Sequence, residues 1–101
     1  MAVVSADYAL ERLHQGLHLI PGYMAGGIER YVMRGVPCGD FLTALLSNDF
    51  MEAVAHADDE NQSALAGWAK FLYNYTPPGC YGSPQRLAAW IAQGGLIGDR
   101  S

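Results

Sequence analysis

The sequence is poor in positive charge. Six of its 101 residues are lysine or arginine, against ten aspartates and glutamates, and the formal net charge is −4. The six cations are scattered along the chain rather than gathered in a stripe. A protein that binds duplex nucleic acid needs such a stripe to neutralise phosphates. The composition therefore argues against direct duplex binding and favours an acidic protein that covers a basic site on a partner.

Cysteines and long hydrophobic runs are also scarce. The two cysteines, Cys38 and Cys80, lie far apart and form no Cys-x-x-Cys or Cys/His metal spacing. The chain does not open on a basic region followed by a long apolar run, and no apolar stretch is long enough to cross a bilayer. We therefore expect a cytoplasmic protein with two reduced thiols, no metal, no cofactor and no membrane partner.

Apolar residues, in contrast, are plentiful. Half of the residues are hydrophobic and 16% are charged, which is enough apolar surface for one folded domain with a core. So low a charged fraction also indicates that some apolar surface is covered by another subunit, so we expect a homo-oligomer. The expected domain spans residues 1–101, with residues 1–4 and 96–101 loosely ordered.

Residues that begin or end helices divide the chain into short segments, and no strand-like alternation persists. Ser5 favours the start of a first helix, and Pro21 favours the first turn of a second. Gly35 ends that second helix, and either Ser47 or Asn48 caps a fourth. The later segments expected to be helical are 41–47, 49–57, 59–74 and a last helix that begins at Ser83-Pro84 and ends at Gly94-Gly95.

The segment 59–74 has the widest apolar face. Leu65, Trp68 and Leu72 share one side of it, and Phe71 extends that side. Such a face is typical of a helix surrounded by others. The sequence therefore predicts an all-α fold, a compact single domain of five or six short helices packed around a central helix, with Trp68 as the most buried residue.

The candidate catalytic groups lack the partners that catalysis requires. His14 and His18 have i, i+4 spacing, but the glutamate and third ligand of the familiar zinc motif are missing. Cys38 precedes a helix start, which lowers a thiol pKa, yet no histidine is placed near it by sequence. The carboxylates that begin with Asp58 match a helix N-terminus better than a metal site. We therefore expect no catalytic residue and no enzyme activity.

Arginine, tyrosine and amide side chains are the candidate binding residues. Arg30 and Arg34 share one helix face, and the N–H groups after Ser83 could meet an anion. Arginines and tyrosines also dominate interaction hot spots, although these tyrosines can instead cover the edge of the core with their hydroxyls in water. The candidate ligand- or partner-binding residues are Arg30, Tyr31, Arg34, Asn48, Asp49, Asp58, Asp59, Tyr73, Asn74, Tyr81 and Ser83.

Residues 20–92 resemble small proteins encoded by tailed phages, prophages and related mobile elements of proteobacteria. The segments that carry the resemblance are Gly22-Tyr23-Met24-Ala25-Gly26-Gly27-Ile28-Glu29-Arg30-Tyr31-Val32, Gly39-Asp40-Phe41-Leu42-Thr43-Ala44, Leu46-Ser47-Asn48-Asp49, Ala57-Asp58-Asp59-Glu60-Asn61, Phe71-Leu72-Tyr73-Asn74 and Gly82-Ser83-Pro84. Cys38 and Tyr81 depart from the pattern, which has proline and tryptophan there. The resemblance implies a setting, a bacterial host cell, rather than a mechanism.

Three functions are compatible with that setting. The first is stoichiometric inhibition of a host defence component, in the manner of an anti-CRISPR protein, with acidic residues facing a basic nucleic-acid-binding surface. The second is a small-ligand binder that sequesters a nucleotide immune signal, with Arg30 and Arg34 on phosphates and Tyr31, Tyr73 or Tyr81 stacked on a base. The third is a regulatory or structural adaptor of the mobile element.

Overall fold

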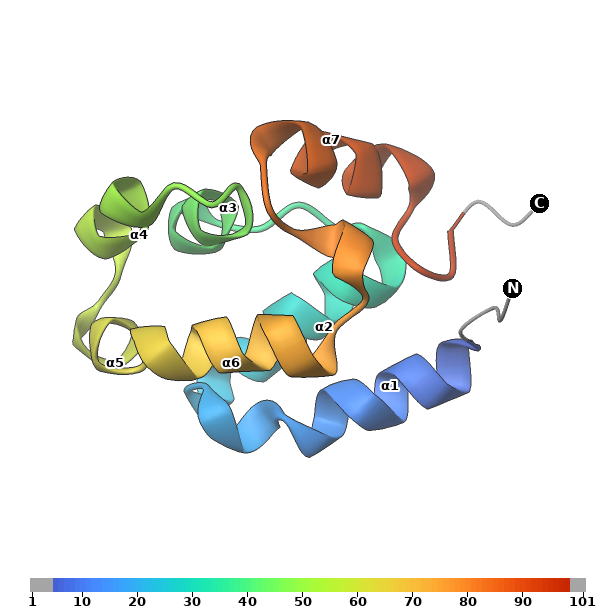
Figure 1. Cartoon of the computed structure of the whole chain (residues 1–101), viewed down its shortest axis with the longest axis horizontal. Helices are drawn as coiled ribbons and strands as arrows, with labels where there is room; N and C mark the ends of the chain where they lie inside the picture. Colours follow the sequence, from blue (N-terminus) through green and yellow to red (C-terminus); the bar gives the residue numbers. More distant parts are fainter. Residues whose placement is uncertain (1–4, 99–101) are drawn as a thin grey trace.

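The structure, a computed structural model, describes residues 5–98. Within that range the chain is entirely helical, with seven α-helices, three short 3₁₀ turns and no strand (Figure 1). This confirms the predicted all-α class. The elements are α1 Ala6–Gln15, η1 Leu17–Leu19, η2 Gly22–Met24, α2 Ala25–Arg34, α3 Asp40–Leu46, α4 Phe50–His56, α5 Asp59–Ser63, α6 Leu65–Tyr75, η3 Pro78–Cys80 and α7 Pro84–Gln93.

Several helix ends lie where capping chemistry predicts them. The Ser5 hydroxyl accepts a hydrogen bond from the backbone N–H of Tyr8, and the Ser83 hydroxyl accepts one from that of Arg86. Gly35 and Gly94 follow α2 and α7 in the left-handed conformation, with φ of 70° and 83°, which side chains with a Cβ disfavour. Local residue types therefore mark all four boundaries.

Two predicted helix starts are wrong. Pro21 precedes the 3₁₀ turn η2, and α2 begins only at Ala25. Asp49, rather than Ser47 or Asn48, caps α4, because its carboxylate accepts from the N–H of Glu52 at 3.3 Å. Asn48 instead takes a left-handed backbone, with φ of 65°, in the tight turn between α3 and α4.

The segment 59–74, predicted as one helix, is two. The backbone leaves helical geometry at Ala64, with φ of −99° and ψ of 11°, so α5 and α6 are separate elements. The described range consequently holds seven α-helices instead of the expected five or six. The interruption lets Asn61 of α5 turn towards Trp68 of α6, whose indole N–H donates to the side-chain amide oxygen of Asn61 at 2.9 Å.

Trp68 is the largest of the fully buried side chains, as predicted. Phe41 of α3 and Phe71 of α6 meet its ring edge-on, with ring centroids 5.8 Å and 5.9 Å away. Tyr31 of α2 is also fully buried, and its hydroxyl donates to the carbonyl of Cys80 at 2.6 Å. The core thus joins α2, α3, α6 and the η3 turn through large rings whose polar atoms have partners.

The end of α2 is capped by residues far away in the sequence. The N–H groups of Leu96 and Ile97 donate to the carbonyls of Val32 and Met33, at 3.0 Å and 2.9 Å. The indole N–H of Trp90 lies 3.1 Å from the carbonyls of Tyr31 and Val32. Residues 96–98 therefore differ from the loosely ordered tail that was expected, while residues 1–4 and 99–101 lie outside the described range.

One glycine is required by close packing. Gly67 of α6 lies against the backbone carbonyl of Leu19, so that a Cβ on Gly67 would collide with the carbonyl oxygen. A backbone oxygen cannot move aside as the end of a flexible side chain can. The absence of a side chain at position 67 thus allows the η1 turn to pack directly on α6.

We therefore predict that Gly67→Ala lowers the free energy of unfolding by about 1–3 kcal/mol, the usual cost of overpacking. Urea denaturation followed by circular dichroism measures the change. Gly22→Ala is the matched control because nothing lies within 4 Å of a Cβ at that position. Equal stability of the two variants would contradict this account of Gly67.

Candidate binding surfaces

The acidic residues are concentrated in the middle of the chain. Between Arg34 and Lys70 there is no lysine or arginine, and that stretch holds six of the ten carboxylates. Five of the six belong to α4, α5 or the residues just before them. These two helices lie together at one end of the molecule, away from the start of α1 (Figure 1). We call this region the acidic end; its carboxylates are those of Asp49, Glu52, Asp58, Asp59 and Glu60.

The carboxylates of the acidic end divide into two groups. Asp49 and Asp58 accept hydrogen bonds from the backbone at the starts of α4 and α5, so they stabilise the helices themselves. Asp59 and Glu60 are exposed in the first turn of α5 and cap nothing. Glu52 is exposed and lies 3.3 Å from His56, one turn further along α4. Glu52, Asp59 and Glu60 are therefore the carboxylates available to a partner.

Two large apolar side chains are exposed on the same end. Helix α4 is anchored to the core through Ala53, which is fully buried. Phe50 and Met51 of α4 are instead 62% and 76% exposed. Aromatic residues and methionine are enriched at the centres of protein interfaces. The acidic end thus combines negative charge with apolar side chains of the type that a protein partner buries.

A chain of hydrogen bonds connects the acidic end to the core. The Tyr23 hydroxyl donates to the Asp58 carboxylate, and the buried Asn61 side-chain amide donates to the Tyr23 oxygen at 3.4 Å. The Asn61 carbonyl in turn accepts from Trp68. The hydrogen bond to Asp58 raises the pKa of Tyr23 to about 12 and lowers the pKa of Asp58. Asp58 is therefore a structural carboxylate, whereas the sequence placed it among the candidate binding residues.

Of the predicted tyrosines, Tyr81 lies within electrostatic range of Tyr73 and of the Arg86 guanidinium on α7. Burial raises the pKa of Tyr81, the neighbouring Cys80 and Tyr73 raise it further, and the Arg86 guanidinium lowers it. Tyr73 is 78% exposed. Sequence reasoning missed Arg86, although its place three residues after the predicted cap Ser83 was a usable signal. The Ser83 hydroxyl already satisfies the Arg86 N–H, so one donor of the predicted anion site is occupied.

The predicted arginines lie elsewhere. Arg30 lines a hollow of about 270 Å³ with Tyr23, Cys38 and the loop before α3, and neither Tyr73 nor Tyr81 contributes to it. Arg34 is exposed near the end of α2. Tyr31 is wrong as a stacking residue, because its ring is fully buried in the core. Asn74 lies near the end of α6 and donates to the carbonyl of Lys70 at 3.1 Å.

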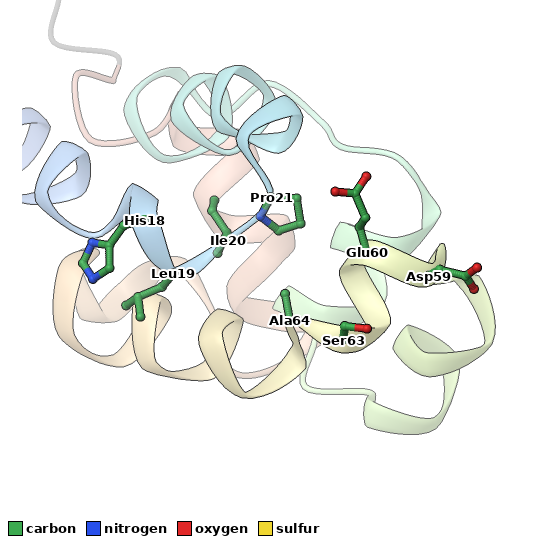
Figure 2. Close-up of a pocket in the computed structure, with 8 residues that line it drawn as sticks. All are labelled: His18, Leu19, Ile20, Pro21, Asp59, Glu60, Ser63 and Ala64. Carbon is green, nitrogen blue, oxygen red and sulfur yellow. The ribbon is translucent and has the colours of Figure 1, made fainter.

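The titratable groups of residues 5–98 do not converge in a deep cleft. In the open hollow of Figure 2, His18 lies on one side, while Asp59 and Glu60 project from α5 on the other. His14 pairs with Glu29 at 2.7 Å, but both side chains are largely exposed. Burial raises the pKa of both cysteine thiols to about 11, which disfavours the reactive thiolate.

Two further properties of residues 5–98 bear on the function. This part of the chain holds no group of three or more histidine, cysteine, aspartate or glutamate residues arranged to bind a metal ion. None of its helices has the length and apolar character that crossing a bilayer requires.

Comparison with protein-family models, with curated protein sequences and with solved structures finds no match to this chain.

We predict that Asn61→Ala lowers the free energy of unfolding by about 1–3 kcal/mol, because it leaves the buried Trp68 N–H without an acceptor. Urea denaturation followed by tryptophan fluorescence measures this loss. Gln62→Ala, an exposed amide at the next position of α5, serves as the control and changes stability little. An equally large loss of stability in Gln62→Ala would mean that any substitution in α5 destabilises the protein, and that the hydrogen bond to Trp68 does not account for the effect of Asn61→Ala.

The lowered pKa of Asp58 predicts a specific dependence of stability on pH. Above its ordinary value of 3.8 the carboxylate is charged in both folded and unfolded chains, and its stabilising contribution is complete. As the pH falls through the lower folded-state pKa, that contribution is lost. Asp58→Asn keeps a good helix cap but cannot titrate, so its stability should fall less between about pH 6 and pH 3.

Denaturant midpoints of the native chain, Asp58→Asn and Asp59→Asn at both pH values test this expectation. Asp59→Asn removes the same charge from the neighbouring position and should retain the native pH dependence. Parallel curves for the native chain and Asp58→Asn would show that the Tyr23 hydrogen bond does not hold the carboxylate in its charged form.

Proposed function

We propose that this chain is a non-enzymatic accessory protein of a phage or mobile element that inhibits a host defence component by stoichiometric binding. The observation that carries the proposal is the acidic end. It combines five carboxylates with the exposed apolar side chains Phe50 and Met51, and the stretch around it has no lysine or arginine. The phage setting comes from the resemblance of residues 20–92.

Each feature of the acidic end suits a basic protein surface. Uncompensated negative charge steers a protein towards a positively charged partner and disfavours neutral or acidic ones. Nucleic-acid-binding defence proteins, such as CRISPR effectors, hold their nucleic acids in positively charged channels. Phe50 and Met51 would add apolar burial at the centre of the contact. In this proposal the acidic end occupies the channel and competes with the nucleic acid.

The alternative functions have less support. Sequestration of a nucleotide signal by Arg30 and Arg34 would use none of the predicted stacking residues, because Tyr31 is buried and the hollow at Arg30 lacks Tyr73 and Tyr81. The tyrosine that does line this hollow is Tyr23, and its hydroxyl is bound to the Asp58 carboxylate, whose negative charge disfavours a phosphate. An adaptor of the mobile element would also use exposed apolar side chains, but it has no need of one-signed charge. The proteins retained in a binding experiment separate inhibitor from adaptor.

We expect the tagged chain to retain a nucleic-acid-binding defence protein from a lysate of its host at low salt. The double substitution Asp59→Asn with Glu60→Gln should weaken that binding about tenfold, a change of ~1.4 kcal/mol, because it removes two exposed charges without removing a helix cap. Mass spectrometry identifies the retained protein, and biolayer interferometry with the purified partner measures the affinity.

Asp7→Asn with Glu11→Gln is the matched control, since it removes one aspartate and one glutamate charge from exposed positions on α1. It should leave the affinity almost unchanged. Retention of no defence protein at low salt would count against the proposal, as would equal weakening by the two double variants. Phe50→Ala with Met51→Ala should also weaken binding, and the factor by which the affinity falls should be the same at low and high salt, because salt screens charges and not apolar contacts.

A further inference from the structure

A half-enclosed pocket lies between the first helix and the end of α6, away from the acidic end. Its volume is about 170 Å³. The residues on which the argument rests are Tyr8, Arg12, Asn74, Tyr75, Pro77 and Pro78. The walls are thus mainly rings, with one cation and one side-chain amide among them. Pockets that bind small molecules combine apolar walls with a few placed polar groups in this way.

The cation of the pocket is held in a fixed position. The Arg12 guanidinium lies over the Tyr75 ring, 4.8 Å from its centroid. Gly16, which has no Cβ, lets Tyr75 lie directly against the end of α1. Tyr75 is therefore fixed by contacts with both Gly16 and the Arg12 guanidinium. Stacking orients the Arg12 fork before any ligand arrives, which reduces the entropy lost on binding.

Arg12 has no carboxylate partner among the described residues. The contacts between basic side chains and carboxylates in residues 5–98 are those of His14 with Glu29 and of His56 with Glu52. A guanidinium fork without an internal partner matches a carboxylate or phosphate with two parallel hydrogen bonds. Tyr8 lies one turn before Arg12 on α1 and is 58% exposed, so it offers a ring face to whatever the guanidinium holds.

We propose that this pocket binds a small organic anion in which a carboxylate or phosphate is joined to a flat ring. Arg12 takes the anionic group, Tyr8 and the two prolines contact the ring, and the Asn74 amide hydrogen-bonds to a polar atom at its edge. The arrangement differs from the predicted pairing of Arg30 with Arg34. It is also independent of the proposed function, because no carboxylate of the acidic end contributes to it.

Isothermal titration of the full chain tests the proposal with three probes. Adenosine monophosphate represents a ring joined to a phosphate, 4-hydroxyphenylacetate a ring joined to a carboxylate, and inorganic phosphate an anion without a ring. Saturable binding of at least one ring-bearing probe, at least about tenfold tighter than inorganic phosphate, supports the proposal. The ring-bearing probe that binds more tightly shows whether the pocket prefers a phosphate or a carboxylate. Equal binding of all three probes, or binding of none, overturns the proposal.

Substitutions locate the binding. Arg12→Gln should lower the affinity for the ring-bearing probe at least about tenfold. Arg12→Lys should lower that affinity less, because lysine keeps the charge but lacks the forked guanidinium. Tyr8→Ala should weaken the same probe. Arg86→Gln and Tyr73→Ala are the matched controls, an exposed arginine and an exposed tyrosine outside the pocket.

Circular dichroism of each variant separates lost binding from lost folding. If Arg12→Gln unfolds, protection of the native protein's Arg12 from a guanidinium-modifying reagent by the bound probe, with Arg86 unprotected, provides the same information. Equal weakening by Arg86→Gln, or an unchanged affinity in a folded Arg12→Gln variant, overturns the assignment.

Discussion

Burying the indole of Trp68 creates a requirement that shapes much of the molecule, because its N–H group must find an acceptor away from water. The acceptor is Asn61, seven residues earlier. In an uninterrupted helix residues so spaced are separated by about 10.5 Å along the axis, too far for this contact. The break at Ala64 brings the two together, and it also sets the direction in which α5 leaves the core.

Asn61 then extends the same polar connection to the surface. It contacts Tyr23, which contacts Asp58, and Asp58 caps the helix that contains Asn61. A single polar path therefore joins the centre of the core to the start of α5. The exposed Asp59 and Glu60 follow directly on this anchored position. The charges offered to a partner thus stand on a rigid support, although they themselves make no internal bond.

Local chemistry made part of this fold predictable. The caps at Ser5 and Ser83 and the stops at Gly35 and Gly94 use residue types that mark helix ends by themselves, so the sequence was sufficient to identify them. The distant hydrogen bonds that Leu96 and Ile97 add at the end of α2 had no such signal. The width of the apolar face around Trp68 likewise indicated its burial. The interruption at Ala64 was not predictable, because alanine favours helix and the hydrogen bond across the break, from Trp68 to Asn61, is seen only in the structure.

The candidate sites were less predictable for the same reason. Tyr31 lies on the apolar face of its helix, as a core residue does, but tyrosine is also common in binding sites. Only the packing of α2 on η3 shows that Tyr31 belongs to the core. Tyr81 comes within electrostatic range of both Tyr73 and Arg86, which spacing along the chain does not reveal. The stacking of Arg12 on Tyr75 joins residues 63 positions apart and had no sequence signal.

The capping of α2 by Leu96 and Ile97 also affects the order of events during synthesis. The last carbonyls of α2 acquire their partners only after residues 90–97 have left the ribosome. A nascent chain halted at Gln93 would hold most of its helices but would present the terminus of α2 to solvent. Completion of the domain is thus delayed until this late segment is free, and proteolytic trimming near Gly94 would reverse the final step of folding.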